Sequence, residues 1–355
     1  RAEYRPTYLL KRGQYNLPDK SRELWPAIPD CLPPLKADQP KNRLGLARWL
    51  IDRDNPLVAR VAVNHVWKRL FGKGLFSAEN VGVQGTPPSH PLLLDWLAVG
   101  FIESGWDLKA LHKRIVMSAT YRQSSDYTAD LLATDPENRW LARGARFRLP
   151  AELVRDNALA VSGLLSPRIG GPSARPYQPA GLWEELAGGA NDGPYKPDTG
   201  DGLYRRSLYT YRKRTVSHPT LATFDAPSWE ICQVKRGRTN TPLQSLALLN
   251  DVTYVEAARQ LATRMIQSGG DMAESQIARG FELTLLRKPS ADELTQLAGS
   301  FDQYTEYYET EPAAAKELIH IGDSAVADEI PATRLAAMTA VASVLLNLDE
   351  TITRE

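Results

Sequence analysis

Side chains that hold metals, haem or disulfide frameworks are scarce in this sequence of 355 residues, which contains two cysteines and five histidines. Cys31 and Cys232 cannot form a disulfide framework and lack metal-ligand spacing, so we expect either one bridge between them or two unpaired, buried thiols. No Cys-x-x-Cys-His motif and no His-x-x-x-His motif occurs. We therefore expect no metal site and no cofactor in this chain, and no haem attached to it by the usual motif.

An excess of charge of one sign and long apolar runs are also missing. The net charge is +1, so no overall field steers ligands and any electrostatic function must be local. We expect no nucleic-acid partner, because neither an overall basic charge nor a nucleic-acid-binding motif occurs. No apolar run is long enough to span a bilayer, so we expect no membrane span. The chain begins with Arg1, and we expect it to be a piece of a longer protein, in which the lack of a leader says little.

Apolar residues recur at helical spacing through most of the sequence after residue 41. This pattern predicts a mainly α fold, an irregular multi-helix bundle with a few short strands and long loops rich in proline and glycine. The density of proline at the start predicts an extended arm laid on a surface. The expected parts are the arm (1–40), an N-terminal helical subdomain (41–171), a loop-rich basic and aromatic segment (172–238) and a C-terminal helical subdomain (239–355).

The stretch from residue 235 to residue 250 combines cations with a strong helix start. Thr241-Pro242-Leu243-Gln244 predicts a capping box with proline at the first helical position. The residues that follow are apolar nearly all round, which predicts a buried helix. Free amides at this start and the preceding Arg236 and Arg238 could together bind an anion. In the alternative, short polar residues only cap the helix and the arginines pair with carboxylates elsewhere.

Cations and aromatic rings are concentrated between residues 204 and 238. This segment has eight positive side chains against Asp225 and Glu230: Arg205, Arg206, Arg212, Lys213, Arg214, Lys235, Arg236 and Arg238. The aromatic side chains Tyr204, Tyr209, Tyr211, Phe224 and Trp229 alternate with them. Such a mixture suits anionic or sugar-like ligands, which guanidinium groups can bond and rings can stack upon. Alternatively, carboxylates neutralise the cations inside the fold, with Glu152, Asp156, Glu184 and Glu185 as the candidates.

Acid–base chemistry has three candidates, His90, His112 and Asp156, because histidine titrates near neutrality. Their spacing matches no catalytic motif. In the structural alternative His90 caps a helix start, and His112 lies on the surface of a helix beside the apolar Leu111. Cys232 with His218 could suggest a thiol nucleophile, but nothing in the sequence orients the pair.

Several long motifs occur in the order of a known family. They are VAVNHVWKRLFGKGL (61–75), PPSHPLLLDWL (87–97), GWDLKALH (105–112), SATYRQSS (118–125) and RTNTPLQ (238–244). From about residue 40 to residue 349 the chain resembles the C-terminal domain of unknown function in large exported planctomycete proteins. In that family the domain follows a cytochrome c-like module. The resemblance implies an extracytoplasmic location and a c-type haem in a neighbouring domain, but no activity.

Two functions of different classes fit these observations. The first is a non-catalytic docking or scaffold module, whose partners are a cytochrome c-like domain and an anionic polysaccharide. Its expected ligand-binding residues are Arg205, Arg206, Arg236, Arg238, Asn240 and Thr241. The alternative is an extracytoplasmic redox or hydrolytic enzyme that acts on an anionic carbohydrate and is coupled to the haem-bearing neighbour. Its site would combine Arg238 and Asn240 with His90, His112 and Asp156, and the loop 172–202 would be its lid.

Overall fold

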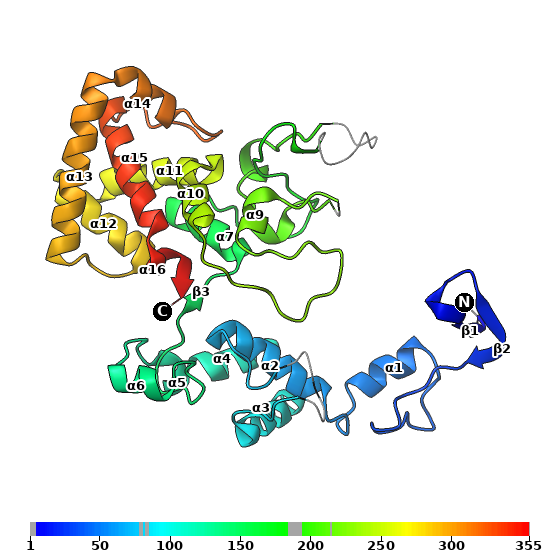
Figure 1. The fold of residues 1–355 in the computed structure, drawn as a ribbon. Helices are drawn as coiled ribbons and strands as arrows, with labels where there is room; N and C mark the ends of the chain where they lie inside the picture. The colour runs from blue at the N-terminus through cyan, green and yellow to red at the C-terminus, as the bar shows by residue number, and fades with distance from the viewer. Residues whose placement is uncertain (1–4, 78–80, 82–84, 184–193, 214, 355) are drawn as a thin grey trace. The chain divides into compact units, whose positions relative to one another are not determined.

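A computed structural model describes residues 5–77, 81, 85–183, 194–213 and 215–354 of the chain. The chain divides into two compact units, Arg1–Ala145 and Arg146–Glu355 (Figure 1). Helices dominate the described part of both units, and the strands are few and short, so the predicted mainly α class is confirmed.

The first unit begins with a hairpin, in the part of the chain where we expected an extended, proline-rich arm. Strand β1 (Thr7–Leu10) pairs antiparallel with β2 (Pro18–Leu24), and the short 3-10 turn η1 (Lys11–Gly13) lies between them. Pro18 is the first residue of its strand, a position where a missing N–H is tolerated. The proline-rich chain continues to residue 40 without a further strand or helix.

Helices form the rest of the first unit, and their ends follow the capping residues. They are α1 (Arg43–Leu50), α2 (Val58–Phe71), α3 (Pro91–Glu103), α4 (Leu108–Val116), α5 (Ala119–Arg122) and α6 (Ala129–Thr134). The Asn42 side chain accepts from the amides of Leu44 and Gly45, and Asp107 caps α4 in the same way. Helices α2, α3 and α4 enclose a core that contains Val63, Trp67, Leu94, Leu97, Phe101, Leu111 and Ile115.

Trp96 of α3 is 59% exposed, although it lies among the apolar residues of this helix. Helical spacing explains the difference, because Leu94, Leu97 and Phe101 share the buried face and position 96 falls outside it. The guanidinium carbon of Arg114 lies 5.2 Å from the centre of the Trp96 ring. Cys31 and Cys232 are unpaired, as one of the two expected alternatives had it, but both are exposed and not buried.

The second unit is a bundle around one apolar helix. Its elements are β3 (Phe147–Arg148), α7 (Ala151–Ser162), η2 (Gly200–Gly202), η3 (Ser207–Tyr209), α9 (Pro219–Thr223), α10 (Pro242–Asn250), α11 (Val252–Ser268), α12 (Ala273–Leu285), α13 (Ala291–Thr310), α14 (Pro312–Ile319), α15 (Ala332–Asn347), α16 (Asp349–Ile352) and β4 (Thr353–Arg354). Helix α15 packs against α11, α13 and α14 (Figure 1), and because it is apolar on nearly every side it lies in the core.

Helix α7 belongs to the second unit, although we expected a subdomain boundary only at residue 171. It packs against α11 in the bundle, and Asn157 donates to the carbonyl of Thr351 at 3.0 Å. Helix α7 also contacts α9 and η3, both in the basic and aromatic segment. The segment 172–238 and the helices on either side of it therefore share one compact unit.

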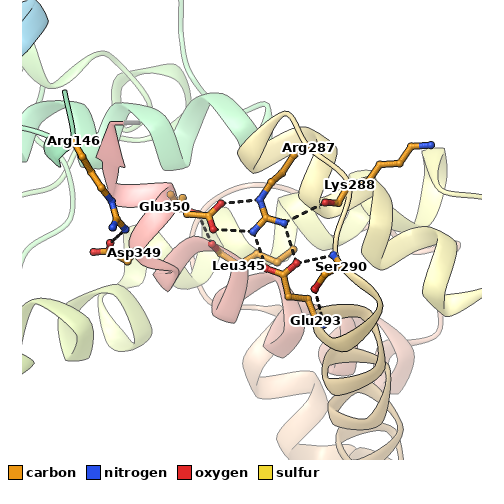
Figure 2. A network of polar contacts seen from close by, with 9 residues as sticks. Arg146, Arg287, Lys288, Ser290, Glu293, Leu345, Asp349 and Glu350 are labelled. Carbon is orange, nitrogen blue, oxygen red and sulfur yellow. Dashed lines mark hydrogen bonds and ion pairs between the residues drawn. The ribbon is translucent and has the colours of Figure 1, made fainter. Parts of the chain in front are cut away.

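Ion pairs fasten the last helix of the second unit to the turn between α12 and α13 (Figure 2). Arg287 donates to Glu350 through Nε and one terminal nitrogen, each at 2.8 Å. It also donates to both oxygens of Glu293, at 2.7 and 2.9 Å, and Glu293 accepts from the amide of Ser290. Nearby, Arg146 lies 2.6 Å from Asp349. These contacts hold α16 in place and position β4 beside β3.

Candidate anion-binding site

Gln244 organises the helix start on which the sequence analysis centred. The predicted capping box of Thr241 and Gln244 forms, with Pro242 in the first turn. Gln244 is fully buried, and its side-chain nitrogen donates to the carbonyl of Thr223 at 2.9 Å and to the hydroxyl of Thr239 at 3.2 Å. Its side-chain oxygen accepts from Arg148. One side chain thus ties the start of α10 to α9, to the preceding loop and to β3.

The apolar composition of α10 predicted a helix buried on nearly every side, but most of its side chains are exposed. Leu248 is 1% exposed, whereas Leu243 and Leu246 are 59% and 56% exposed. Only the face that carries Gln244 and Leu248 enters the core. An apolar composition does not determine which faces of a helix are covered, because this depends on how many neighbouring helices pack against it.

Internal partners occupy the groups that we expected to bind a ligand beside α10. The side-chain oxygen of Asn240 accepts from Arg148 at 2.8 Å, and the amide of Thr241 donates to Gln244. The guanidinium carbon of Arg238 lies 4.6 Å from the centre of the Phe147 ring. The helix start is therefore held by the protein's own side chains.

We expected Arg205 and Arg206 to bind a ligand at the surface, but both side chains are at least partly buried. Arg205 is buried, and it donates to the carbonyls of Gly170 and Pro172. Its guanidinium carbon lies 3.9 Å from the centre of the Tyr209 ring. Arg206 is half-buried, and its Nε atom is enclosed with no hydrogen-bond partner among the described residues.

Asp156 acts in the same interior network. It accepts from the amide of Ser207 at 2.7 Å, and its neighbour Arg155 donates to the carbonyls of Leu203 and Arg205 at 2.5 and 2.9 Å. Burial lowers the pKa of Arg155, although the nearby Asp156 opposes this. These bonds attach the segment 203–207 to α7.

Two arginines of the basic segment meet at one carboxylate. Glu152, in the first turn of α7, accepts from Arg212 at 3.3 Å and from Arg236 at 2.8 Å. The alternative in which internal acids neutralise the cations is therefore correct for Glu152. Glu184 and Glu185 lie outside the described residues. Two guanidinium groups share a single negative charge here, so positive charge remains in excess. We call this group of three residues the Glu152 clamp.

Aromatic rings lie beneath the cations next to the clamp. The guanidinium carbon of Arg212 lies 4.3 Å from the centre of the Trp229 ring, and the ammonium of Lys213 lies 4.3 Å from that of Trp183. Trp229 is 53% exposed. Arg212, Lys213 and Trp229, together with His218, line a hollow of about 20 Å³. Together with the Glu152 clamp, they form what we call the Arg212–Trp229 surface.

His218 lines this hollow as a neutral imidazole. Its Nε2 lies 3.0 Å from the carbonyl of Tyr177, to which it must donate, and its Nδ1 is enclosed without a hydrogen-bond partner among the described residues. Burial, and then the nearby Arg155, lower the pKa of His218 to about 4. At neutral pH the positive charge of this surface therefore comes from arginine and lysine alone.

The candidate histidines for acid–base chemistry have local partners in the first unit. Nδ1 of His90 lies 3.0 Å from the hydroxyl of Ser89, and Nδ1 of His112 lies 2.6 Å from the carbonyl of Leu108, one turn earlier in its own helix. Asp156 belongs to the second unit. Within the described residues, no group of three or more His, Cys, Asp or Glu side chains is placed to hold a metal ion.

Sequence analysis did not select Arg212 and Trp229 as binding residues, and it named His218 only as a possible partner of Cys232. Arg212 and Trp229 were part of the cationic and aromatic composition, but nothing in their spacing distinguished them from their neighbours. Pro219 beside His218 indicates a helix start, and His218 is the residue that immediately precedes α9.

The fold is that of a mainly α protein, and its second unit carries a cationic and aromatic surface. The chain belongs to the family PSD1, described as a protein of unknown function (DUF1553), whose model matches residues 42–301. Searches of curated proteins and of solved structures gave no match. Among the described residues, no helix has both the length and the apolar character needed to cross a membrane.

Proposed function

We propose that this chain is a non-catalytic docking module that binds an anionic, sugar-containing polymer through the Arg212–Trp229 surface. The observation that carries the proposal is the convergence of Arg212 and Arg236 on the single carboxylate of Glu152. Burial lowers the pKa of Arg212, the nearby Glu152 opposes this, and Arg236 adds a smaller lowering effect. An incoming anion would relieve the repulsion between the two guanidinium groups, which can each bond a carboxylate through two nitrogens.

The exposed ring of Trp229 favours a ligand that has flat apolar faces as well as negative charge. The ring of Trp229 lies against Arg212 and is half exposed, whereas Trp183, which lies against Lys213, is buried. The apolar faces of sugar rings stack on such side chains, and this places a uronate or similar acidic sugar with its carboxylate near the guanidinium groups. The hollow of about 20 Å³ admits only one small group of the ligand, so the polymer lies along the surface.

Binding of polygalacturonate, compared with its methyl-esterified form, tests this proposal. Calorimetry and affinity electrophoresis should show binding of the acidic polymer that weakens with added salt, and little binding of the ester, which keeps the sugar chain but lacks the charge. Arg212→Gln and Trp229→Ala should each weaken binding by about tenfold, which corresponds to ~1.4 kcal/mol. Arg279→Gln is the matched control, because Arg279 forms an exposed pair with Glu282 on α12. Equal affinity for the ester, or no effect of either variant, would overturn the proposal.

A second part of the proposal concerns the setting of the module. We propose that it acts outside the cytoplasm, beside a cytochrome c-like domain in the same or an associated protein. The resemblance of the motifs at 61–75, 87–97 and 238–244 to exported planctomycete proteins supports this part. The complete gene should then encode an export signal and a Cys-x-x-Cys-His motif. A gene with neither feature would refute this part and leave the binding proposal standing.

The enzyme alternative has less support. His90, His112 and Asp156 each have a hydrogen-bond partner close in their own unit, and two of these partners are backbone groups. The lid that we expected at 172–202 includes residues 184–193, which lie outside the described part of the chain.

A further inference from the structure

The first unit contains a hollow of about 380 Å³ between the proline-rich chain and α1. This volume is in the range of small-molecule sites. Its apolar wall includes Pro33, Pro34 and Trp49, and its polar wall includes Lys36, Arg48 and Asp52. From this chemistry we infer that the hollow binds a neutral saccharide.

Specific contacts fix the walls of the hollow. The indole nitrogen of Trp49 donates to the carbonyl of Pro33 at 2.7 Å, and Lys36 lies 2.7 Å from Asp52. At Gly45 the helix approaches the chain so closely that an added Cβ would lie 1.9 Å from the carbonyl oxygen of Pro40. The chain before α1 is thus attached to the helix at Trp49 and at Gly45, which gives the site a defined shape.

The charges that line the hollow are already matched. Lys36 pairs with Asp52 and lies 3.7 Å from Asp54, while Asp52 also accepts from the amide of Asp54 at 3.0 Å. Two cations, Lys36 and Arg48, face two carboxylates in the lining. No excess charge is left to attract an ion, in contrast to the Glu152 clamp. A charged ligand would have to compete with the pair of Lys36 and Asp52.

The lining of the hollow nevertheless keeps unused hydrogen-bond donors and unused acceptors. Lys36 has three N–H donors and Arg48 has five. Lys36 uses one of them towards Asp52, and Arg48 uses one towards Gln39. The carboxylate of Asp54 is mostly exposed and accepts no hydrogen bond among the described contacts. Sugar hydroxyls both donate and accept, and planar carboxylate and guanidinium groups can bond two neighbouring hydroxyls at once. Trp49 and the two prolines provide the apolar surface on which a sugar face can lie.

The test is a titration of the whole chain, labelled with nitrogen-15, with glucose, galactose, mannose, N-acetylglucosamine and the β-1,4 disaccharides of glucose and N-acetylglucosamine. At least one should shift the Trp49 indole resonance with a Kd of about 1 mM, a typical weak affinity. Arg48→Gln and Asp54→Asn should each weaken binding by at least about fivefold, while Arg212→Gln should leave it unchanged. Their folding is checked by the remaining resonances of the first unit.

Three outcomes would overturn the inference. They are no shift with any saccharide at millimolar concentration, shifts that survive both variants, or a stronger response to glycine or alanine, which would indicate a zwitterion site. The inference does not depend on the proposed binding of an acidic polymer by the second unit. Arg212→Gln separates the two, because it should weaken only the binding of polygalacturonate.

Discussion

The carboxylate of Glu152 lies 2.8 Å from the guanidinium of Arg236, although the two residues are 84 positions apart in the sequence. Arg212 reaches the same carboxylate from another direction. Glu152 therefore occupies the place where the carboxylate of an external ligand could be bound by the same two arginines. This relationship leads to the first prediction.

Glu152→Gln should destabilise the second unit by about 1–2 kcal/mol, because two partly exposed guanidinium groups lose their shared charge. Thermal unfolding should show a Tm lower by several degrees, since a unit of this size loses about 2–4 °C per kcal/mol. Sulfate should raise the Tm of the variant more than that of the wild type, because an anion can replace the lost charge. An equal rise in both proteins would contradict an anion site at the clamp.

Acid should weaken the ion-pair network that holds α16, because protonation of Glu293 removes a partner of Arg287. Hydrogen bonds from Arg287, and then from the Ser290 amide, lower the pKa of Glu293 to about 2 from an ordinary value of 4.5. Its contribution to stability is therefore present above pH 4.5 and is lost as the pH falls towards 2. Glu293→Gln should reduce the fall in Tm across this window, whereas Glu282→Gln on α12 should not. An unchanged pH profile in Glu293→Gln would contradict the role of this network.

Two leucines of α10 should differ sharply in their response to truncation. Leu248→Ala should cost about 2–5 kcal/mol of unfolding free energy, because Leu248 is buried in the core. Leu246→Ala should change it by no more than about 0.5 kcal/mol, because that side chain is exposed. Urea unfolding of the two variants measures the difference. Equal losses would show that the exposed face of α10 is covered in solution.

Two glycines inside helices should respond in opposite directions to alanine. Gly45→Ala should destabilise the first unit, because the new Cβ would collide with the backbone carbonyl of Pro40. Gly299→Ala on α13 should stabilise the second unit by up to about 1 kcal/mol, since nothing lies near its Cβ position and alanine is the better helix former. Thermal unfolding checks both. A neutral Gly45→Ala would mean that the chain before α1 is not attached to the helix.

Helix ends were predictable because capping is local. Asn42, Asp107 and the pair of Thr241 and Gln244 determine their helix starts through bonds within a few residues. Burial was less predictable, as Trp96 and Leu243 show, because periodicity does not reveal how many neighbours cover a helix. Strand β2 was missed because its sequence is polar and gains its structure from pairing with β1.

The candidate site was predictable in composition but not in geometry. The cationic and aromatic character of residues 204–238 is a property of the sequence, and Glu152 was one of four carboxylates that could have paired with it. Which carboxylate pairs with the cations depends on the packing of α7 against η3 and α9. These elements are far apart in the sequence, so no local sequence pattern predicts their contact. Burial of Arg205 by the carbonyls of Gly170 and Pro172 has the same long-range origin.

The pairing of β3 with β4 places Phe147 directly opposite Arg354. The polypeptide of residues 146–355 thus enters and leaves its bundle at adjacent points. A short linker could join those points, and new ends could be opened at Gly269 and Gly270 between α11 and α12. Such a circular permutant should keep the bundle intact, and the same geometry would allow these residues to be inserted as a cassette into a surface loop of another protein.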